Sequence, residues 1–230
     1  MRAVFAVLRL LGAAAIVAAV VAQLLRSLEV WGQDPSADVG FLLVGFFSFF
    51  TIDSNIAAAV VLLLGAGILL LRRGDDPRWF AVLRLCVVTY MVVTGIVYNL
   101  LLRGIELPQG STVPWSNEVL HVVGPLLLLL DWLLAPGRAP LPWRALWAVV
   151  AFPIVWAVYT LVRGPLAIDS RTGEPWYPYP FLNPANSPNG YLSVAFYVVL
   201  IALIIGAVGA GAIWVSRRRA RTAPASAVAE

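Results

Sequence analysis

The longest apolar stretch of the chain, residues 39–71, reads VGFLLVGFFSFFTIDSNIAAAVVLLLGAGILLL and decides the fold class. A helix rises about 1.5 Å per residue, so about 20 residues cross the roughly 30 Å hydrocarbon core of a bilayer. These 33 residues can therefore span a membrane, although the segment must tilt or begin along the interface. Its centre, FFTIDSN, places polar residues and an acid in apolar surroundings.

The composition of the whole chain also favours an integral membrane protein. Hydrophobic residues make up 61% of the 230 residues, and the mean hydropathy is +0.87. Charged residues make up 12%, about half of the share expected in a soluble globular domain. A water-exposed surface needs more charge than this, so the composition argues against a soluble two-domain protein.

Six apolar segments are long enough to cross a bilayer. We expect the first to be a retained helix, because it exceeds the roughly 7–15-residue core of a cleaved signal peptide. The sequence thus predicts an all-α membrane protein, with one six-helix transmembrane domain over residues 1–216 and a short tail, basic and then flexible, over 217–230. The six segments are residues 4–25, 39–71, 79–102, 117–134, 144–162 and 191–215.

Arginine placement predicts the orientation of the helices. The chain has 16 arginines and no lysine. With the N-terminus inside, ten arginines fall on the cytoplasmic side and four on the other, and the ten include the cluster SRRRAR after the last segment. Because cytoplasmic loops are enriched in basic residues, we expect both termini to be cytoplasmic. Anionic headgroups account for the positive charge without a nucleic-acid partner. The use of Arg with abundant Ala, Val and Gly is typical of a GC-rich bacterial genome, which suggests the bacterial cytoplasmic membrane.

The longest outer loop covers residues 163–190, RGPLAIDSRTGEPWYPYPFLNPANSPNG. Its prolines and aromatic residues indicate a rigid, amphipathic segment at the interface and not a flexible linker. Two interpretations are open: a lid over an outward-facing cavity, or a packed loop that anchors the bundle.

Polar side chains inside a membrane are the informative ones, because burying them costs free energy. In the second segment Ser48, Thr51 and Asn55 recur at spacings of three and four, so a continuous helix would place them on one face, with Ser54 at its margin. Asp53 would point away from that face. The face should look into the bundle, where it either bonds to neighbouring helices or contributes to a site.

The fourth segment contains the chain's one histidine, His121. Glu118 lies three residues earlier, on the same face of a regular helix, where it could hold the imidazole in one tautomer. Ionisable groups inside a membrane are candidates for catalysis or ligand binding. We expect neither a metal nor another cofactor, because no second histidine and no cysteine cluster accompanies His121.

Two charges within the segments match in depth. Arg84 lies near the cytoplasmic start of the third segment, and Asp131 lies near the cytoplasmic end of the fourth. Both are therefore at similar depths from the cytoplasmic side. Pairing is the least costly way to hold both in a membrane, so we predict a structural ion pair between them.

The third segment carries a second polar stripe, because Tyr90, Thr94 and Tyr98 recur every four residues and Asn99 lies beside them. The stripe either lines the same cavity as the polar face of the second segment or joins helices together.

The second and fourth segments run in the same direction, which places Thr51 and His121 in the outer half of the membrane or near its midplane. If they meet, a hydroxyl and an imidazole form a nucleophile and general base, the minimal apparatus for acyl transfer. Ser54, Asn55 and Tyr98 have groups suited to stabilising an oxyanion, but the sequence does not choose among them.

The order of three motifs, FFTIDSN in the second helix, HVVGP in the fourth and WYPYPFL in the last outer loop, resembles the androgen-induced and androgen-dependent TFPI-regulating membrane proteins. The resemblance implies six helices, both termini inside, and intramembrane threonine hydrolysis of fatty acid esters of hydroxy fatty acids. It also implies that Thr51 is the nucleophile and His121 the base, with Pro125 following the histidine. In a bacterium, another lipid ester could be the natural substrate.

Two other classes of function stay open. A transporter or lipid-binding protein would use His121, Glu118 and Asp53 as proton or ligand sites, although the sequence lacks the repeats on which transporters are built. A partner-binding membrane protein would pack closely through the glycines at positions 206, 209 and 211. The sequence indicates a lipid substrate and a bilayer as partners, and it leaves the oligomeric state undetermined.

Overall fold

The computed structural model describes residues 1–105 and 112–221. Within them, six helices are long and apolar enough to cross a membrane, as the sequence predicted. Residues 222–230, the end of the predicted flexible tail, lie outside the described part. The first five residues of the predicted tail, 217–221, continue the last helix. The six spans are Arg2–Gly32, Phe50–Leu71, Arg78–Leu102, Pro114–Leu134, Trp143–Leu166 and Tyr191–Arg218.

Some spans combine several elements, because π-helical and 3-10 turns interrupt or extend the α-helices. The two π turns are η1, which ends the span that begins with α4, and η2, which joins α5 to α6. The elements are α1 Arg2–Gly32, α2 Val39–Phe46, α3 Phe50–Leu71, α4 Arg78–Val97, η1 Tyr98–Leu102, α5 Pro114–Glu118, η2 Val119–Val123, α6 Gly124–Leu134, η3 Trp143–Ala145, α7 Leu146–Arg163, η4 Gly164–Leu166, η5 Pro180–Leu182, η6 Pro184–Asn186 and α8 Tyr191–Arg221.

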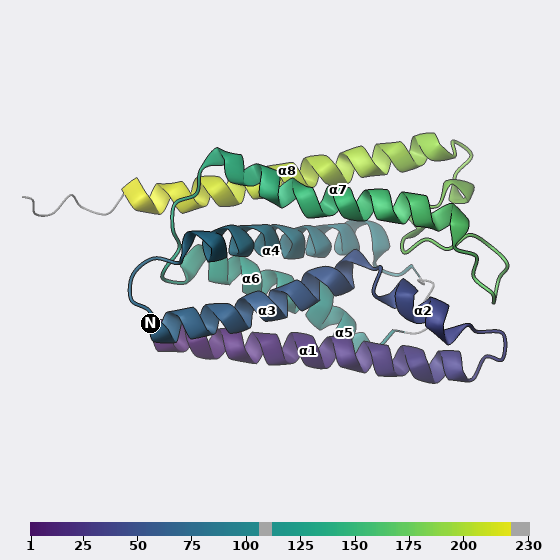
Figure 1. Ribbon diagram of the computed structural model, residues 1–230, viewed down its shortest axis with the longest axis horizontal. Coiled ribbons are helices and arrows are strands. Elements are labelled where there is room, and N and C mark those ends of the chain that lie inside the picture. Colours follow the sequence, from purple (N-terminus) through teal and green to yellow (C-terminus); the bar gives the residue numbers. More distant parts are fainter. Residues whose placement is uncertain (106–111, 222–230) are drawn as a thin grey trace, which may run out of the picture.

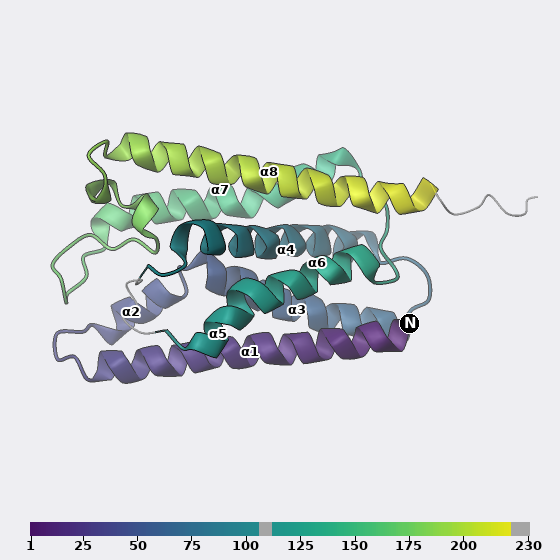
Figure 2. The same ribbon diagram turned by 180° about the vertical axis from the view of Figure 1, so that it is seen from behind.

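The helices form a bundle with α4 at its centre. Helices α1 and α3 lie along one side, α7 and α8 along the other, and α4 and α6 lie between them in both views (Figures 1 and 2). Burial agrees, because 67% of an apolar 18-residue stretch of the span that contains α4 is buried, against 17% for the span that contains α7. The N-terminus and the end of α8 lie at the same end of the bundle.

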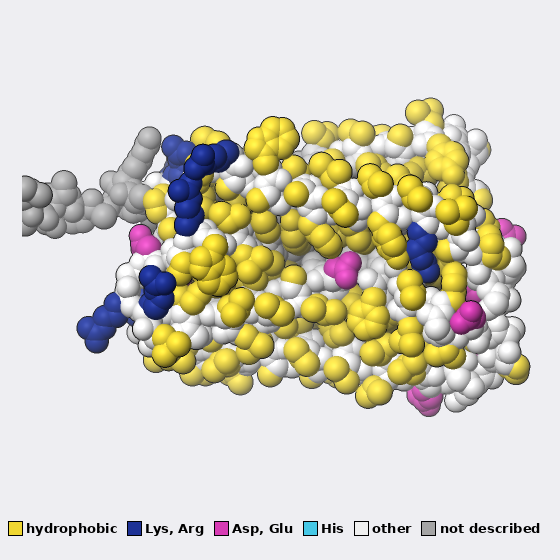
Figure 3. Space-filling model, viewed as in Figure 1, with side chains coloured by type: hydrophobic (Ala, Val, Ile, Leu, Met, Phe, Trp, Pro, Cys, Tyr) yellow, Lys and Arg dark blue, Asp and Glu magenta, His cyan; other side chains and the backbone are white. Residues whose placement is uncertain are grey.

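The outer surface is suited to lipid contact. Figure 3 shows apolar side chains across the length of one face, with most charged side chains toward its two ends. On α7, Trp147 and Val155 are 78% and 67% exposed. Soluble monomers rarely expose apolar patches of more than a few hundred Å². The fold is therefore that of a multi-pass membrane protein, as the composition indicated.

The second predicted segment is not one continuous helix. It breaks between α2 and α3, where Phe49 is extended (φ −73°, ψ 125°). The Ser48 hydroxyl donates back to the carbonyl oxygen of Val44, a bond that bends helices. It also lies 2.9 Å from the Tyr159 hydroxyl on α7. Ser48 therefore does not share a helical face with Thr51, and the predicted three-residue stripe is wrong at this position.

Arg84 and Asp131 are in contact, within a larger buried network. Arg84 donates to Asp131 at 2.9 Å and to Asp76 at 2.5 Å. Arg9 donates twice to Asp131, at 2.8 and 3.0 Å, and also to the carbonyl oxygen of Gly65. The network ties α1, α3, α4 and α6 together. The sequence did not indicate Arg9 or Asp76 as members, because the prediction matched charges only within the third and fourth segments, and these two residues lie outside both.

Candidate active site

Thr51 is the second residue of α3, so the break before this helix defines its environment. The first N–H groups of a helix have no partner within it, and they form the positive end of the helix dipole. The N–H of Thr51 instead donates to the phenol oxygen of Tyr179 at 3.2 Å. The break thus brings a hydroxyl and a helix N-terminus to the same point inside the bundle.

His121 lies in the π turn η2, between α5 and α6. π turns inside α-helices are frequent at functional sites. The Nδ1 of His121 lies 2.9 Å from the carbonyl oxygen of Asn117, which can only accept a hydrogen bond, so Nδ1 carries the proton. In the neutral imidazole, Nε2 then has a free lone pair, and it lies 3.3 Å from the Thr51 Oγ1. The imidazole also stacks on the Tyr98 ring, with 3.8 Å between centroids.

The predicted support of His121 by Glu118 is wrong. Glu118 forms an ion pair with Arg103 instead, at 2.8 and 3.2 Å. The π turn begins directly after Glu118 and widens the helix, so residues three apart no longer share a face. Asn99 lies close to the site, because its amide donates to the carbonyl oxygen of His121 at 3.3 Å and accepts from Arg103. The backbone of Asn117 orients the imidazole, a contact that no side-chain pattern could reveal.

Ser54 and Asn55 are fully buried beneath Thr51 and line neither of the cavities that reach it. The Ser54 hydroxyl donates to the Thr51 carbonyl oxygen and lies 3.1 Å from the Thr94 hydroxyl. The Asn55 amide donates to the carbonyl oxygens of Thr51 and Leu120, at 2.9 and 3.2 Å. These two residues therefore hold the first turn of α3 against its neighbours, and neither faces the site itself.

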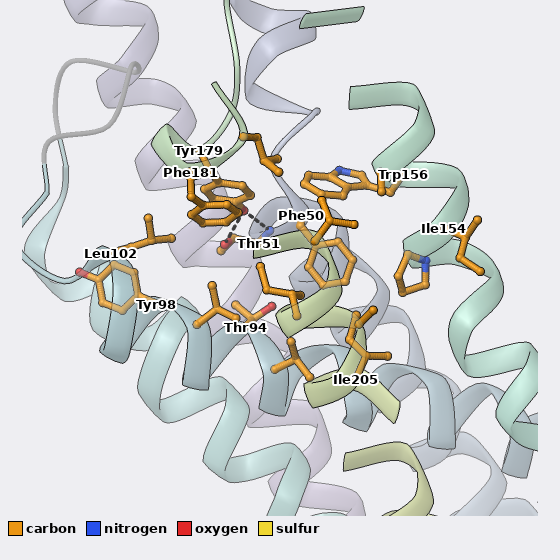
Figure 4. Close-up of a pocket in the computed structure, with 18 of the residues that line it drawn as sticks. Phe50, Thr51, Thr94, Tyr98, Leu102, Ile154, Trp156, Tyr179, Phe181 and Ile205 are labelled. Atoms are coloured by element: carbon orange, nitrogen blue, oxygen red, sulfur yellow. Dashed lines mark hydrogen bonds between the residues drawn. The ribbon is translucent and has the colours of Figure 1, made fainter. Parts of the chain in front are cut away.

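The loop of residues 167–190, called the lid below, packs over the site, which fits both interpretations of this loop. Tyr179 from this loop is 6% exposed, and its hydroxyl lies 3.3 Å from the Thr51 Oγ1 (Figure 4). Burial raises the pKa of Tyr179 to about 12, so the phenol keeps its proton near neutral pH. Trp176 anchors the lid edge-on against the Phe49 ring, at 5.8 Å. The sequence did not indicate Tyr179 as a site residue, although the motif WYPYPFL contains it.

A cavity of about 300 Å³ extends from Thr51 between α3, α4, α7, α8 and the lid. Figure 4 shows Thr51 beneath Tyr179, with Tyr98 to one side and Trp156 to the other. None of the lining residues is charged. Five of the nineteen carry a polar side-chain atom, namely Thr51, Thr94, Tyr98, Trp156 and Tyr179, and all five make hydrogen bonds within the protein. The cavity is thus suited to an apolar chain whose polar end reaches Thr51.

Asp53 is turned away from this site, as the helical spacing predicted. It lines a surface groove with Ser48, Phe152 and Tyr159 and has no ion-pair partner among the described residues. Across residues 1–105 and 112–221, no group of three or more His, Cys, Asp and Glu residues is placed to hold a metal ion.

The arrangement is a threonine hydroxyl with a correctly tautomerised imidazole, a neutral phenol and a helix N-terminus, at the end of an apolar cavity. Such a constellation can deprotonate the hydroxyl and stabilise negative charge beside it. No family model, no curated protein and no solved structure matches this chain. Its function is therefore inferred from the geometry of the site.

Proposed function

We propose that this protein is an intramembrane lipid ester hydrolase with Thr51 as nucleophile and His121 as general base. One observation carries the proposal: the unprotonated Nε2 of His121 faces the Thr51 Oγ1 at 3.3 Å, with the tautomer set by the Asn117 carbonyl oxygen. Hydroxyl–imidazole pairs in hydrogen-bond reach, with the base oriented by a third group, are typical of covalent catalysis. The apolar cavity beside the pair favours an ester with a long hydrocarbon chain.

The first half of the reaction forms an acyl-enzyme. Thr51 Oγ1 attacks the ester carbonyl carbon while its proton passes to His121 Nε2, giving a tetrahedral intermediate and an imidazolium. The bond from the carbonyl carbon to the alcohol oxygen then breaks. His121 returns the proton to that oxygen, and the alcohol leaves, so the enzyme retains the acyl group on Thr51.

The developing oxyanion needs donors, and Tyr179 is the group placed to supply one. Its hydroxyl oxygen accepts a hydrogen bond from the N–H of Thr51, so the phenol proton can be donated. The hydroxyl lies near Oγ1 and can donate to the oxyanion, which is bonded to the same carbon as Oγ1 in the tetrahedral intermediate. The positive end of α3 favours the same negative charge. Among the candidates from the sequence, Ser54 and Asn55 bond elsewhere, whereas Tyr98 borders the cavity.

The second half of the reaction releases the acid. A water molecule attacks the acyl carbon of acyl-Thr51, and His121 Nε2 takes its proton. The bond from the carbonyl carbon to Oγ1 breaks, Thr51 recovers the proton from His121, and the carboxylic acid leaves. The substrate class is an amphiphilic lipid ester, and fatty acid esters of hydroxy fatty acids are one example.

The proposal includes the orientation that the arginines favour, in a bacterial cytoplasmic membrane with both termini cytoplasmic and the lid outside. Ser170→Cys in the lid loop, in a Cys86→Ser background, should react with a membrane-impermeant maleimide in intact cells. Asp75→Cys in the same background should react only after lysis. The reverse pattern would overturn this orientation.

Ester hydrolysis by purified protein in nanodiscs tests the chemistry. Thr51→Val keeps the shape of the side chain but removes the hydroxyl, and we expect kcat to fall by about a thousandfold or more. The kcat of His121→Gln should fall by a comparable factor, whereas Thr51→Ser should retain measurable turnover. If Thr51→Val and His121→Gln both hydrolyse long-chain esters at the wild-type rate, the proposal is wrong.

A transporter is the second candidate, and Asp53 is the observation that favours it: it lies in a span, lines a groove and forms no ion pair with any described residue, and such acids are often functional. Substrate-dependent proton flux into liposomes would then persist in Thr51→Val and be lost in Asp53→Asn. Flux that is absent in wild type would exclude this candidate.

A further inference from the structure

A second cavity reaches the Thr51–His121 pair from another side. Its volume is about 60 Å³, and it borders Gln23, Thr112, Asn117 and His121. Six of its eleven lining residues carry polar side chains, against five of nineteen in the large cavity. Thr51 and Tyr98 line both cavities, so the reacting oxygen stands between an apolar and a more polar compartment.

The small cavity is equipped to hold hydroxyl groups. The Asn117 amide donates to the Tyr98 hydroxyl at 2.5 Å, so the phenol proton of Tyr98 is free to donate to a guest. The Gln23 side chain lies in the same wall, where its carbonyl oxygen accepts the N–H of Val113 at 3.0 Å. A buried water needs about 10–15 Å³ of such space and two to four polar partners, so the cavity has room for water. One of its lining residues, Thr112, is exposed, so this part of the wall lies at the surface of the protein.

We propose that the small cavity takes the alcohol part of the ester and then the hydrolytic water, and that it limits the alcohol to a small polar group. This inference rests on the proposed function and narrows its substrate to esters that join one long acyl chain to an alcohol such as glycerol. The acyl chain lies in the large cavity. Because water attacks where the alcohol left, a single compartment serves both steps.

The size of the small cavity argues against branched esters. In an ester of a hydroxy fatty acid, the alcohol carbon carries two further hydrocarbon arms. With the acyl chain in the large cavity, both arms would have to enter a space of about 60 Å³ that is lined largely by polar groups. We therefore expect the glycerol ester to be the better substrate, although the resemblance found in the sequence implies the branched one.

The test compares two palmitoyl esters with full-length protein in nanodiscs: glycerol monopalmitate and the palmitoyl ester of 9-hydroxystearic acid. We expect kcat/KM to be at least about 10-fold higher for the glycerol ester. Thr112→Phe, at the exposed rim of the small cavity, should lower kcat/KM for that ester by about 10-fold or more. Thr172→Phe, an exposed control in the lid loop away from both cavities, should stay within about twofold of wild type.

A long-chain alkyl fluorophosphonate separates failure of this inference from failure of the proposed function. Its leaving group is fluoride, which needs little space, so Thr112→Phe should still be labelled at Thr51 to within about twofold of wild type. Two results would overturn only the substrate assignment, provided that Thr51 is labelled normally. One is equal turnover of both esters by the wild-type protein, and the other is full activity of Thr112→Phe on the glycerol ester. Wild-type protein that neither reacts at Thr51 nor hydrolyses either ester would overturn the proposed function.

Discussion

At the scale of single residues, three neighbours of Thr51 carry the proposed chemistry. His121 offers a lone pair, Tyr179 offers a proton, and the first turn of α3 contributes the positive end of its dipole. Each acts on a different charge of the reaction, so their effects should be separable by substitution.

Of the three side chains in the proposed mechanism, the sequence singled out Thr51 and His121 as candidates and did not single out Tyr179. Thr51 and His121 stand out because polar and ionisable side chains are costly inside apolar segments. Thr51 lies close to an acid in such a segment, and His121 is the one histidine of the sequence. Tyr179 does not stand out, because its loop is rich in aromatic residues and nothing in the spacing aims one of them at α3. The prediction that Glu118 supports His121 was wrong because a π turn, which has no reliable sequence signature, begins between the two residues.

Tyr179→Phe tests the phenol without removing the ring that packs in the lid. We expect kcat to fall on the order of 100-fold, because an oxyanion donor is lost, while KM changes little. Steady-state kinetics on a long-chain ester provide the measurement. Tyr197→Phe makes the same change on α8, where the ring contacts Phe181 without reaching Thr51, and should retain full activity. Equal kcat values for the two variants would exclude Tyr179 as the donor.

At the scale of elements, the break between α2 and α3 gives the candidate site its geometry. A continuous helix would pair the N–H of Thr51 with the carbonyl oxygen four residues earlier, and no helix terminus would lie beside the Thr51 hydroxyl. The sequence shows no proline or glycine between residues 47 and 50, so the break could not be predicted from its local residues. Contacts with a distant lid fix it, among them the packing of Trp176 on Phe49.

Gly45→Ala tests the packing of the lid against α2. A Cβ at this glycine would lie 2.9 Å from the Trp176 ring, too close for an ordinary contact. We expect destabilisation of about 1–3 kcal/mol and reduced turnover, because the lid must shift. Gly67→Ala in α3 meets no atom within 4 Å, and it should be neutral or stabilising. Thermal unfolding and intrinsic tryptophan fluorescence report both variants, and an unchanged lid in Gly45→Ala would contradict this role.

Helix α7 supplies one wall of the apolar cavity, and Ala157 is a small residue within it. Ala157→Phe should shift the preferred acyl chain toward shorter lengths, lowering kcat/KM for palmitoyl esters by about 10-fold relative to octanoyl esters. Ala151→Phe places the same ring on the exposed face of α7 and should leave the chain-length profile unchanged. Identical profiles in the two variants would show that the cavity does not hold the acyl chain.

At the scale of the whole molecule, the bundle combines a lipid-compatible exterior with a buried ionic network at the end that carries the N-terminus. Composition and segment length were enough to predict the six spans, because bilayer thickness leaves few alternatives. The network was predicted only as the Arg84–Asp131 pair, since matching depths can relate adjacent segments but cannot identify partners such as Arg9 on a distant helix.

Asp131→Asn tests how far this network stabilises the bundle. Asp131 accepts from both Arg9 and Arg84, so the substitution leaves two buried guanidinium groups with less compensation. We expect a loss of about 3–5 kcal/mol and a Tm lower by about 10 °C. Glu29→Gln breaks an exposed pair with Arg26 and should leave Tm nearly unchanged. Equal Tm values for the two variants would contradict a stabilising role.

The most direct measurement of the central claim is the site of covalent modification by a long-chain alkyl fluorophosphonate. The reagent transfers its phosphonate group to an activated hydroxyl and releases fluoride. Tandem mass spectrometry of the labelled wild-type protein should locate a single adduct on Thr51, and folded Thr51→Val protein should carry none. An adduct on another residue, or labelling that persists in Thr51→Val, would contradict the assignment of Thr51 as the nucleophile.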